Sequence, residues 1–194
     1  MKNISILVSG GGSNMQAIID GINSGKVKGV KVSLIISSST KAYAITRAEK
    51  AGIPAKVISN KIITDENERA DLLLSSLKEA DTDFIVLAGY MKILPSIIVR
   101  EYKDRIINIH PSLIPKHCGK GYYGKIVHES VLSAGDSESG ATVHFVDEGV
   151  DTGNIIIQKR VPVKEGDTPE SLAERVLEVE HEIIVEAVNK VVNN

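Results

Sequence analysis

The strongest constraint on the fold is an alternation of short apolar runs with segments of helical periodicity. The mostly apolar runs, each a predicted strand, lie at 4–8, 32–36, 56–58, 84–88 and 105–109. The segments with helical patterns lie between and after them, at 15–22, 41–52, 65–80 and 96–102. In the segment 65–80, we expect Leu72, Leu73 and Leu77 on one buried face. Apolar strands that alternate with helices are typical of a parallel sheet covered on both faces.

The C-terminal part of the chain has a different pattern. Two predicted strands at 141–149 and 154–163 are joined by a short loop, which indicates antiparallel pairing. A final helix is expected after Thr168, a good N-cap, with Pro169 at its first position. Its predicted buried face carries Leu172, Val176, Val179, Ile183 and Ala187. A length of 194 residues suits one core. We therefore predict a single Rossmann-like α/β domain over 1–194, with a mostly parallel sheet, antiparallel strands in the C-terminal half and helices on both faces.

Composition argues against several classes of partner. The formal net charge is −2 and lysine and arginine form no stripe, so no nucleic-acid partner is expected. The apolar runs span about five to seven residues, far below the roughly 20 that cross a bilayer, so no membrane partner is expected. Cys118 is the single cysteine and has no internal disulfide partner, which favours a reducing, cytoplasmic setting.

The segment "SGGGSN", residues 9–14, joins the first predicted strand to the first predicted helix. Ligands of open α/β sheets bind at the carboxyl ends of strands, and glycines before a helix N-terminus let an anion approach the backbone N–H groups. The loop is not a Walker loop, and Met15 stands where a dinucleotide fingerprint needs its last glycine. A single phosphate is therefore the favoured ligand, and a tight turn capped by Ser13 or Asn14 is the alternative.

The segment "IINIHPSLIP", 106–115, ends a strand with two polar side chains. Residues two apart in a strand point to the same face, so Asn108 and His110 lie together at the edge where sites form. Pro111 then ends the strand. An amide donor beside an imidazole suits acyl transfer, because the amide can hold an oxyanion and the imidazole can move protons. A strand end whose side chains satisfy nearby backbone groups is the equally weighted alternative.

A carboxylate beside this pair would orient the imidazole and favour its protonated form. The segment "DEGVDTG" offers Asp147, Glu148 and Asp151 in a glycine-marked loop at the end of a predicted strand. The spacing alone leaves the choice among the three open.

Four segments occur in an order that resembles one family. "ISILVSGGGSNMQAII", "LAGYMKIL", "INIHPSLIP" and "GATVHFVDEGVDTGNIIIQ" together resemble the phosphoribosylglycinamide formyltransferases, and the resemblance covers nearly the whole chain. It implies transfer of the formyl group from the cosubstrate 10-formyltetrahydrofolate to the amine of glycinamide ribonucleotide, in de novo purine biosynthesis. It also implies a cytoplasmic monomer or weak homodimer that needs no metal. The N-terminal half would bind the ribonucleotide, and the C-terminal half would bind folate and carry the catalytic residues.

The resemblance also assigns residues to roles. It makes Asn108, His110 and Asp151 catalytic, with Asn108 and protonated His110 stabilising the oxyanion and Asp151 raising the basicity of His110. The residues it assigns to the ribonucleotide are Gly11, Gly12, Ser13, Asn14 and Glu180. The nearby Glu178 and Glu182 leave the register of Glu180 open. The residues it assigns to folate are Met91, Lys92, Ile93, Leu94, Asn108, Asp147 and Glu148.

The remaining histidines and one long segment fall outside these assignments. His117 and His128 are expected to be exposed, His144 to be a satisfied strand residue, and His181 to lie on a helix surface or in packing. The segment 116–130 is longer than in some relatives, and Asn154 stands where a proline is common. Both departures bear on folate-tail contacts, not on the chemistry.

Three rival functions stay open. A methionyl-tRNA formyltransferase and a formyltetrahydrofolate deformylase would use the same core motifs. We expect neither, because those families add a tRNA-gripping or a regulatory domain that these residues do not display, and the chain is not basic. A binding protein without catalysis is the third rival, and the presence of all three candidate catalytic residues argues against it.

Overall fold

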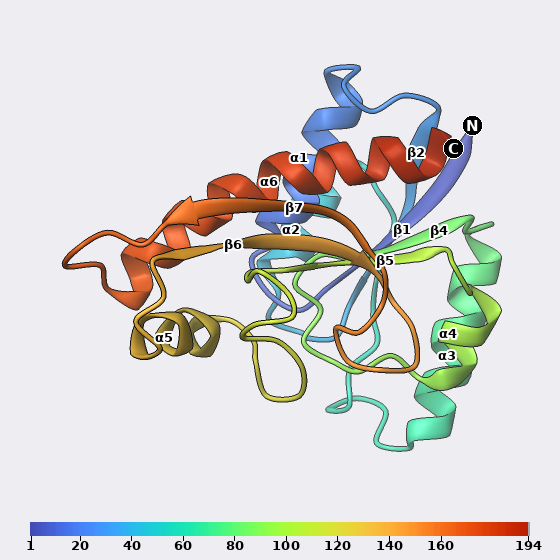
Figure 1. Ribbon diagram of the computed structural model, residues 1–194. Coiled ribbons are helices and arrows are strands. Elements are labelled where there is room, and N and C mark those ends of the chain that lie inside the picture. Colours follow the sequence, from blue (N-terminus) through green and yellow to red (C-terminus); the bar gives the residue numbers. More distant parts are fainter. Residues whose placement is uncertain (194) are drawn as a thin grey trace.

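A computed structural model describes residues 1–193, which form one seven-stranded mixed sheet with helices on both faces (Figure 1). The strand order is β3-β2-β1-β4-β5-β6-β7. The strands are β1 (Lys2–Val8), β2 (Val30–Ser37), β3 (Ala55–Val57), β4 (Phe84–Leu87), β5 (Ile106–His110), β6 (Glu138–Phe145) and β7 (Ile155–Pro162). Neighbours from β3 to β5 pair parallel, whereas β5–β6 and β6–β7 pair antiparallel. The predicted fold class is thereby confirmed.

The helices divide between two hydrophobic clusters, one on each face of the sheet. They are α1 (Ser13–Asn23), α2 (Tyr43–Lys50), α3 (Glu66–Glu79), α4 (Ser96–Glu101), α5 (Lys125–Ser133) and α6 (Pro169–Asn193). Apolar side chains of α1, α2, α5 and α6 join one cluster, and those of α3 and α4 join the other. Strand β1 supplies both clusters, with Ile4 and Ile6 on one face and Leu7 on the other. This double burial explains why every position from Ile4 to Val8 is buried.

Three sequence expectations need correction. From the sequence we predict no helix between 116 and 140, but helix α5 covers the end of the long segment 116–130 and continues to Ser133. Leu72 is 37% exposed, so the buried face of α3 contains Leu73 and Leu77 without it. Strand β6 ends at Phe145, because the chain then leaves the sheet in the loop that leads to β7.

The sheet places the carboxyl ends of β1 and β4 beside each other. Strand β1 lies between β2 and β4, so the chain direction around the sheet reverses there, and such a switch point is where open α/β sheets bind ligands. The hydroxyl of Ser9, just after β1, accepts a hydrogen bond from the backbone N–H of Met91, just after β4, at 2.8 Å.

The long helix α6 packs against α1, β6 and β7. Among the described helices, none is long and apolar enough to cross a membrane.

Candidate active site

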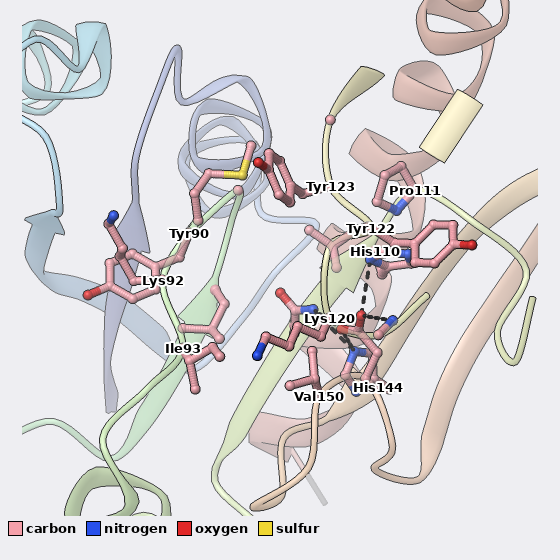
Figure 2. A pocket seen from close by; sticks show the side chains of 18 of the residues that line it. Tyr90, Lys92, Ile93, His110, Pro111, Lys120, Tyr122, Tyr123, His144 and Val150 are labelled. Atoms are coloured by element: carbon pink, nitrogen blue, oxygen red, sulfur yellow. Dashed lines mark hydrogen bonds and ion pairs between the residues drawn. The ribbon is translucent and has the colours of Figure 1, made fainter. Parts of the chain in front are cut away.

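Strand β5 delivers Asn108 and His110 to the wall of a cavity of about 750 Å³. The two side chains lie on the same face, as the strand periodicity predicted, and His110 is only 5% exposed. Figure 2 shows His110 and His144 on one side of this cavity, with Tyr90, Lys92 and Ile93 across from them. The cavity thus places a buried imidazole opposite the segment that follows β4.

Asp151 is the carboxylate that joins the pair. Its Oδ2 lies 3.6 Å from His110 Nδ1 and accepts a hydrogen bond from the Gly119 N–H at 2.9 Å. Its Oδ1 lies 3.4 Å from the Asn108 amide nitrogen. Asp151 has a φ of 58°, a left-handed conformation that aspartate tolerates better than most residues. The contact network therefore contains an amide, an imidazole and a carboxylate from two separate segments.

The other two candidate carboxylates have different partners. Asp147 accepts hydrogen bonds from the Gly149 N–H and the Thr152 hydroxyl and so closes its own loop. Glu148 forms an exposed ion pair with Arg100. Both residues line the cavity, but among the three candidates it is Asp151 whose carboxylate contacts His110.

His144 belongs to the same network, although the sequence indicated only a satisfied strand residue. Both of its ring nitrogens have partners, as that prediction required. The Phe145 carbonyl accepts from Nδ1 at 2.7 Å, so Nε2 can accept from the Asn108 amide at 3.1 Å. Its Nε2 also lies 3.5 Å from Asp151. Asn108 lies opposite His144 in the β5–β6 pairing, and this register produces the contact. The sequence of a single strand does not determine such a register, so the contact could not be predicted.

Burial and neighbouring groups shift the pKa values of His110 and Asp151. Burial lowers the pKa of His110, and although the His117 carbonyl and Asp151 raise it, the pKa stays below its ordinary value. This lowered pKa favours the neutral form of His110 near pH 7. The protonated His110 that the resemblance places beside the oxyanion during the reaction stays a prediction. Burial acts to raise the pKa of Asp151, but the rings of His144 and His110 and the Gly119 N–H outweigh it, so this pKa is lowered. The lowered pKa favours the anionic form of Asp151 near pH 7, next to the His110 ring.

Glu180 connects the last helix to the first. It is 9% exposed and accepts a hydrogen bond from the Asn14 amide at 2.7 Å. Burial raises the pKa of Glu180 to about 7, although the Asn14 hydrogen bond lowers it. Glu178 and Glu182 are exposed, so Glu180 is the glutamate of this helix segment that faces inward. Glu180 lies four residues after Val176 and three before Ile183, so helical spacing places it on the same buried face.

The glycine loop adjoins the cavity. Gly12 has a φ of 74°, and a Cβ on it would lie 2.7 Å from the Ala44 Cβ, so glycine is required there. Ser13 begins α1 directly after it. Among the described residues that line the cavity, Glu180 is present and none belongs to 10–14. The predicted ribonucleotide residues Gly11, Gly12, Ser13 and Asn14 are therefore connected to the cavity through the Asn14–Glu180 hydrogen bond.

The predicted folate segment lies in the cavity wall. Met91, Lys92, Ile93 and Leu94 all line it, with Met91 and Ile93 exposed by 52% and 71%. The loop from Asp147 to Asp151 lines it as well. These exposed apolar side chains leave a surface on which a flat ring could rest, in the same cavity as Asn108 and His110.

The prediction that His117 and His128 are exposed is wrong. His128 is 4% exposed, because α5 turns it inward to the cavity. The His117 side chain is 12% exposed, because Ser130 and Asp136 hold it at 2.7 and 3.0 Å. Within residues 1–193, no group of three or more His, Cys, Asp or Glu side chains is arranged to hold a metal ion.

Comparison with known proteins identifies the class. Residues 2–188 match the model of the formyl transferase family, and the chain belongs to that family. It is 41% identical over 183 residues to phosphoribosylglycinamide formyltransferase of Haemophilus influenzae, covering 94% of this chain and 84% of the relative. The structure superposes on glycinamide ribonucleotide transformylase 1 from Symbiobacterium toebii with a TM-score of 0.91 and 38% identity, covering 97% and 86% of the two chains.

Other relatives are much longer. The trifunctional purine biosynthetic protein adenosine-3 of Drosophila melanogaster is 44% identical over 194 residues, which are 99% of this chain and 14% of that protein. A chloroplastic phosphoribosylglycinamide formyltransferase from Vigna unguiculata is 40% identical, and the match spans 60% of its length. The chain thus covers less than two thirds of these relatives, and in the trifunctional protein it matches a small part.

Proposed function

We propose that this chain transfers the formyl group of 10-formyltetrahydrofolate to the amine of glycinamide ribonucleotide, giving formylglycinamide ribonucleotide and tetrahydrofolate. The observation that carries the proposal is the meeting of Asn108, His110 and Asp151 at one wall of the cavity. A donor, an imidazole and a carboxylate in one network are what acyl transfer to an amine requires. The names of the similar proteins support the choice of donor and acceptor.

Asn108 stabilises the tetrahedral intermediate in this mechanism. One N–H of its amide reaches His144 Nε2 at 3.1 Å, whereas the contact to Asp151 is longer, at 3.4 Å. In the reaction, the second N–H exchanges this longer hydrogen bond to Asp151 for one to the oxyanion that forms from the formyl oxygen. A preorganised donor of this kind contributes about 10²–10³ in rate.

His110 moves the proton. Its Nε2 donates to the His117 carbonyl at 2.9 Å, because a carbonyl can only accept, and Nδ1 then carries the lone pair. As the amine nitrogen bonds to the formyl carbon, Nδ1 takes the amine proton. Nδ1 returns this proton to the folate nitrogen as the bond from that nitrogen to the formyl carbon breaks. Asp151, 3.6 Å from Nδ1, stabilises the imidazolium between the two steps.

The ribonucleotide is assigned to the glycine loop and α6. In this proposal the N–H groups around Gly11, Gly12 and Ser13 receive the phosphate at the start of α1, and Asn14 orients Glu180 toward the ribose hydroxyls. A carboxyl with a pKa of about 7 can accept or donate a hydrogen bond to a hydroxyl near neutral pH.

Folate is assigned to the opposite wall. The exposed side chains of Met91 and Ile93 and the segment from Lys92 to Leu94 would cover the pterin ring. Asp147 and Glu148 would act through the shape of their loop, since their carboxylates already have partners in the protein. We thus propose one formyltransferase domain over 1–194, with the N-terminal half for the ribonucleotide and the C-terminal half for folate and chemistry.

A formyl-transfer assay tests the proposal. Purified protein is mixed with 10-formyltetrahydrofolate and glycinamide ribonucleotide, and deformylated folate is followed by absorbance. Turnover that depends on the acceptor is expected. Free formate released without the acceptor would instead indicate a deformylase, and absence of turnover from folded protein would refute the reaction. Size-exclusion chromatography of the same preparation tests the proposed monomer or weak homodimer, and fractionation of the source cells tests the proposed cytoplasmic location.

A further inference from the structure

We propose that His117 is a positioning residue that fixes the orientation and tautomer of His110. The inference rests on the proposed function and extends it to a residue that is not in the catalytic network itself. His117 acts through its backbone carbonyl, while its side chain holds the backbone in place. We call the side-chain contacts of His117 with Ser130 and Asp136 the His117 clamp.

The first step of the argument is what the backbone near His117 touches. The carbonyl of His117 accepts from His110 Nε2 at 2.9 Å. Two residues on, the Gly119 N–H donates to Asp151 Oδ2 at 2.9 Å. One short segment thus holds both members of the imidazole–carboxylate pair.

The second step is what holds this segment. The ring of His117 lies between two anchors outside it, with Nδ1 at 2.7 Å from the Ser130 hydroxyl and Nε2 at 3.0 Å from Asp136 Oδ2. Ser130 lies in α5, and Asp136 lies in the turn between α5 and β6. Hydrogen bonds from His117 and then from Lys116 lower the pKa of Asp136, so it stays an anion in the clamp. His117 has a φ of 51°, a strained conformation for a histidine that such anchoring maintains.

The third step is the consequence for His110. A neutral imidazole beside an anionic carboxylate would normally turn its N–H toward that carboxylate. Here Nδ1 faces Asp151 at 3.6 Å, and the His117 carbonyl keeps the hydrogen on Nε2. The clamp therefore leaves Nδ1 free to accept a proton on the side where Asn108 and Asp151 meet.

The groups around His110 define the expected pH behaviour. Burial and the neighbouring His144 lower its pKa, whereas the His117 carbonyl and Asp151 raise it. His128, on α5, is a further neighbouring histidine, and its own pKa is lowered by burial and by His110. Loss of the carbonyl contact removes one of the two groups that raise the pKa, so the titration of His110 must move to lower pH.

The test uses variants of the clamp in the full chain. His117→Phe keeps a flat ring and removes both side-chain hydrogen bonds, and His117→Gln restores a donor toward Asp136. Glu138→Gln is the matched control, because it removes an exposed ion pair with Arg160 two residues from Asp136. We expect His117→Phe to lower kcat about 10- to 100-fold, as loss of an orienting partner typically does, with both KM values within about twofold. His117→Gln is expected to recover part of kcat, and Glu138→Gln to match wild type.

A nuclear magnetic resonance titration of His110 separates positioning from packing. We expect the midpoint to fall in His117→Phe and to stay unchanged in Glu138→Gln. An unchanged midpoint and kcat in a folded His117→Phe protein would overturn the inference, and so would a loss seen in KM alone. If His117→Phe does not fold, Asp136→Asn must lower kcat and the midpoint in the same direction, and wild-type values there would also overturn it. Absence of wild-type turnover would refute the proposed reaction, while the titration would still test the clamp.

Discussion

Replacement of Asp151 by asparagine removes the charge next to His110 and leaves the shape of the side chain nearly unchanged. Oδ2 lies 3.6 Å from His110 Nδ1, and the Asp151 side chain is 10% exposed. Two unit charges at this distance interact by about 5 kcal/mol at an effective dielectric constant of ~20. Since one pKa unit corresponds to about 1.4 kcal/mol, this is an upper bound of roughly three units on the pKa of His110. An opposite charge in such a site typically shifts a pKa by about one to three units.

We therefore expect Asp151→Asn to lower the pKa of His110 by about one unit or more, and to lower kcat by about 10²-fold or more. The pKa is measured by histidine resonances and kcat by the formyl-transfer assay, with circular dichroism as the control for folding. The asparagine can still accept from the Gly119 N–H, so the loop contact is kept. Wild-type kcat in the folded variant would refute the role of the carboxylate, and an unmoved His110 titration would refute the electrostatic reasoning.

Three further predictions concern residues that we propose to bind the ribonucleotide. Burial raises the pKa of Glu180 to about 7 in the folded protein, so the wild-type protein is most stable below the ordinary glutamate pKa and loses up to about 3 kcal/mol as pH rises through 7. In Glu180→Gln this loss should be absent when urea unfolding at pH 5 is compared with that at pH 8. Gly12→Ala should destabilise the protein by about 1–3 kcal/mol, because its φ is 74° and its Cβ would meet Ala44, whereas Gly10→Ala, with open space, should unfold near the wild-type urea midpoint. Ser13→Ala should raise KM for the ribonucleotide more than KM for folate, and the reverse pattern in steady-state assays would contradict the phosphate assignment.

The sheet could be predicted from sequence because its strands are buried on both faces. Runs such as Ile4–Val8 and Phe84–Ala88 are almost wholly apolar, and this run of apolar residues located each strand to within a residue or two. Asn108 and His110 could be placed together by the period of a strand alone. Glu180 could have been assigned by helical spacing, since Val176 and Ile183 share its buried face.

The parts of the site that could not be predicted depend on contacts between distant segments. His144 reaches Asn108 because of the register between β5 and β6, and that register is set by packing of the whole sheet. The burial of His117 and His128 depends on α5, whose short apolar pattern within a glycine-rich segment gave too weak a helical signal. The lowered pKa of His110 depends on how completely the fold removes it from water, which residue spacing does not report.

The hydrogen bond between Asn14 and Glu180 joins residues 166 positions apart in the chain. A ribosome must therefore complete almost the whole domain before this part of the site can exist. Contacts of such long sequence separation carry a large loop-closure cost and form slowly, so we expect the contact between α1 and α6 to form late in folding. Under the proposed assignment, the ability to hold the ribonucleotide therefore reports on the completion of folding: a chain that has not docked its C-terminal helix has no carboxylate at Asn14.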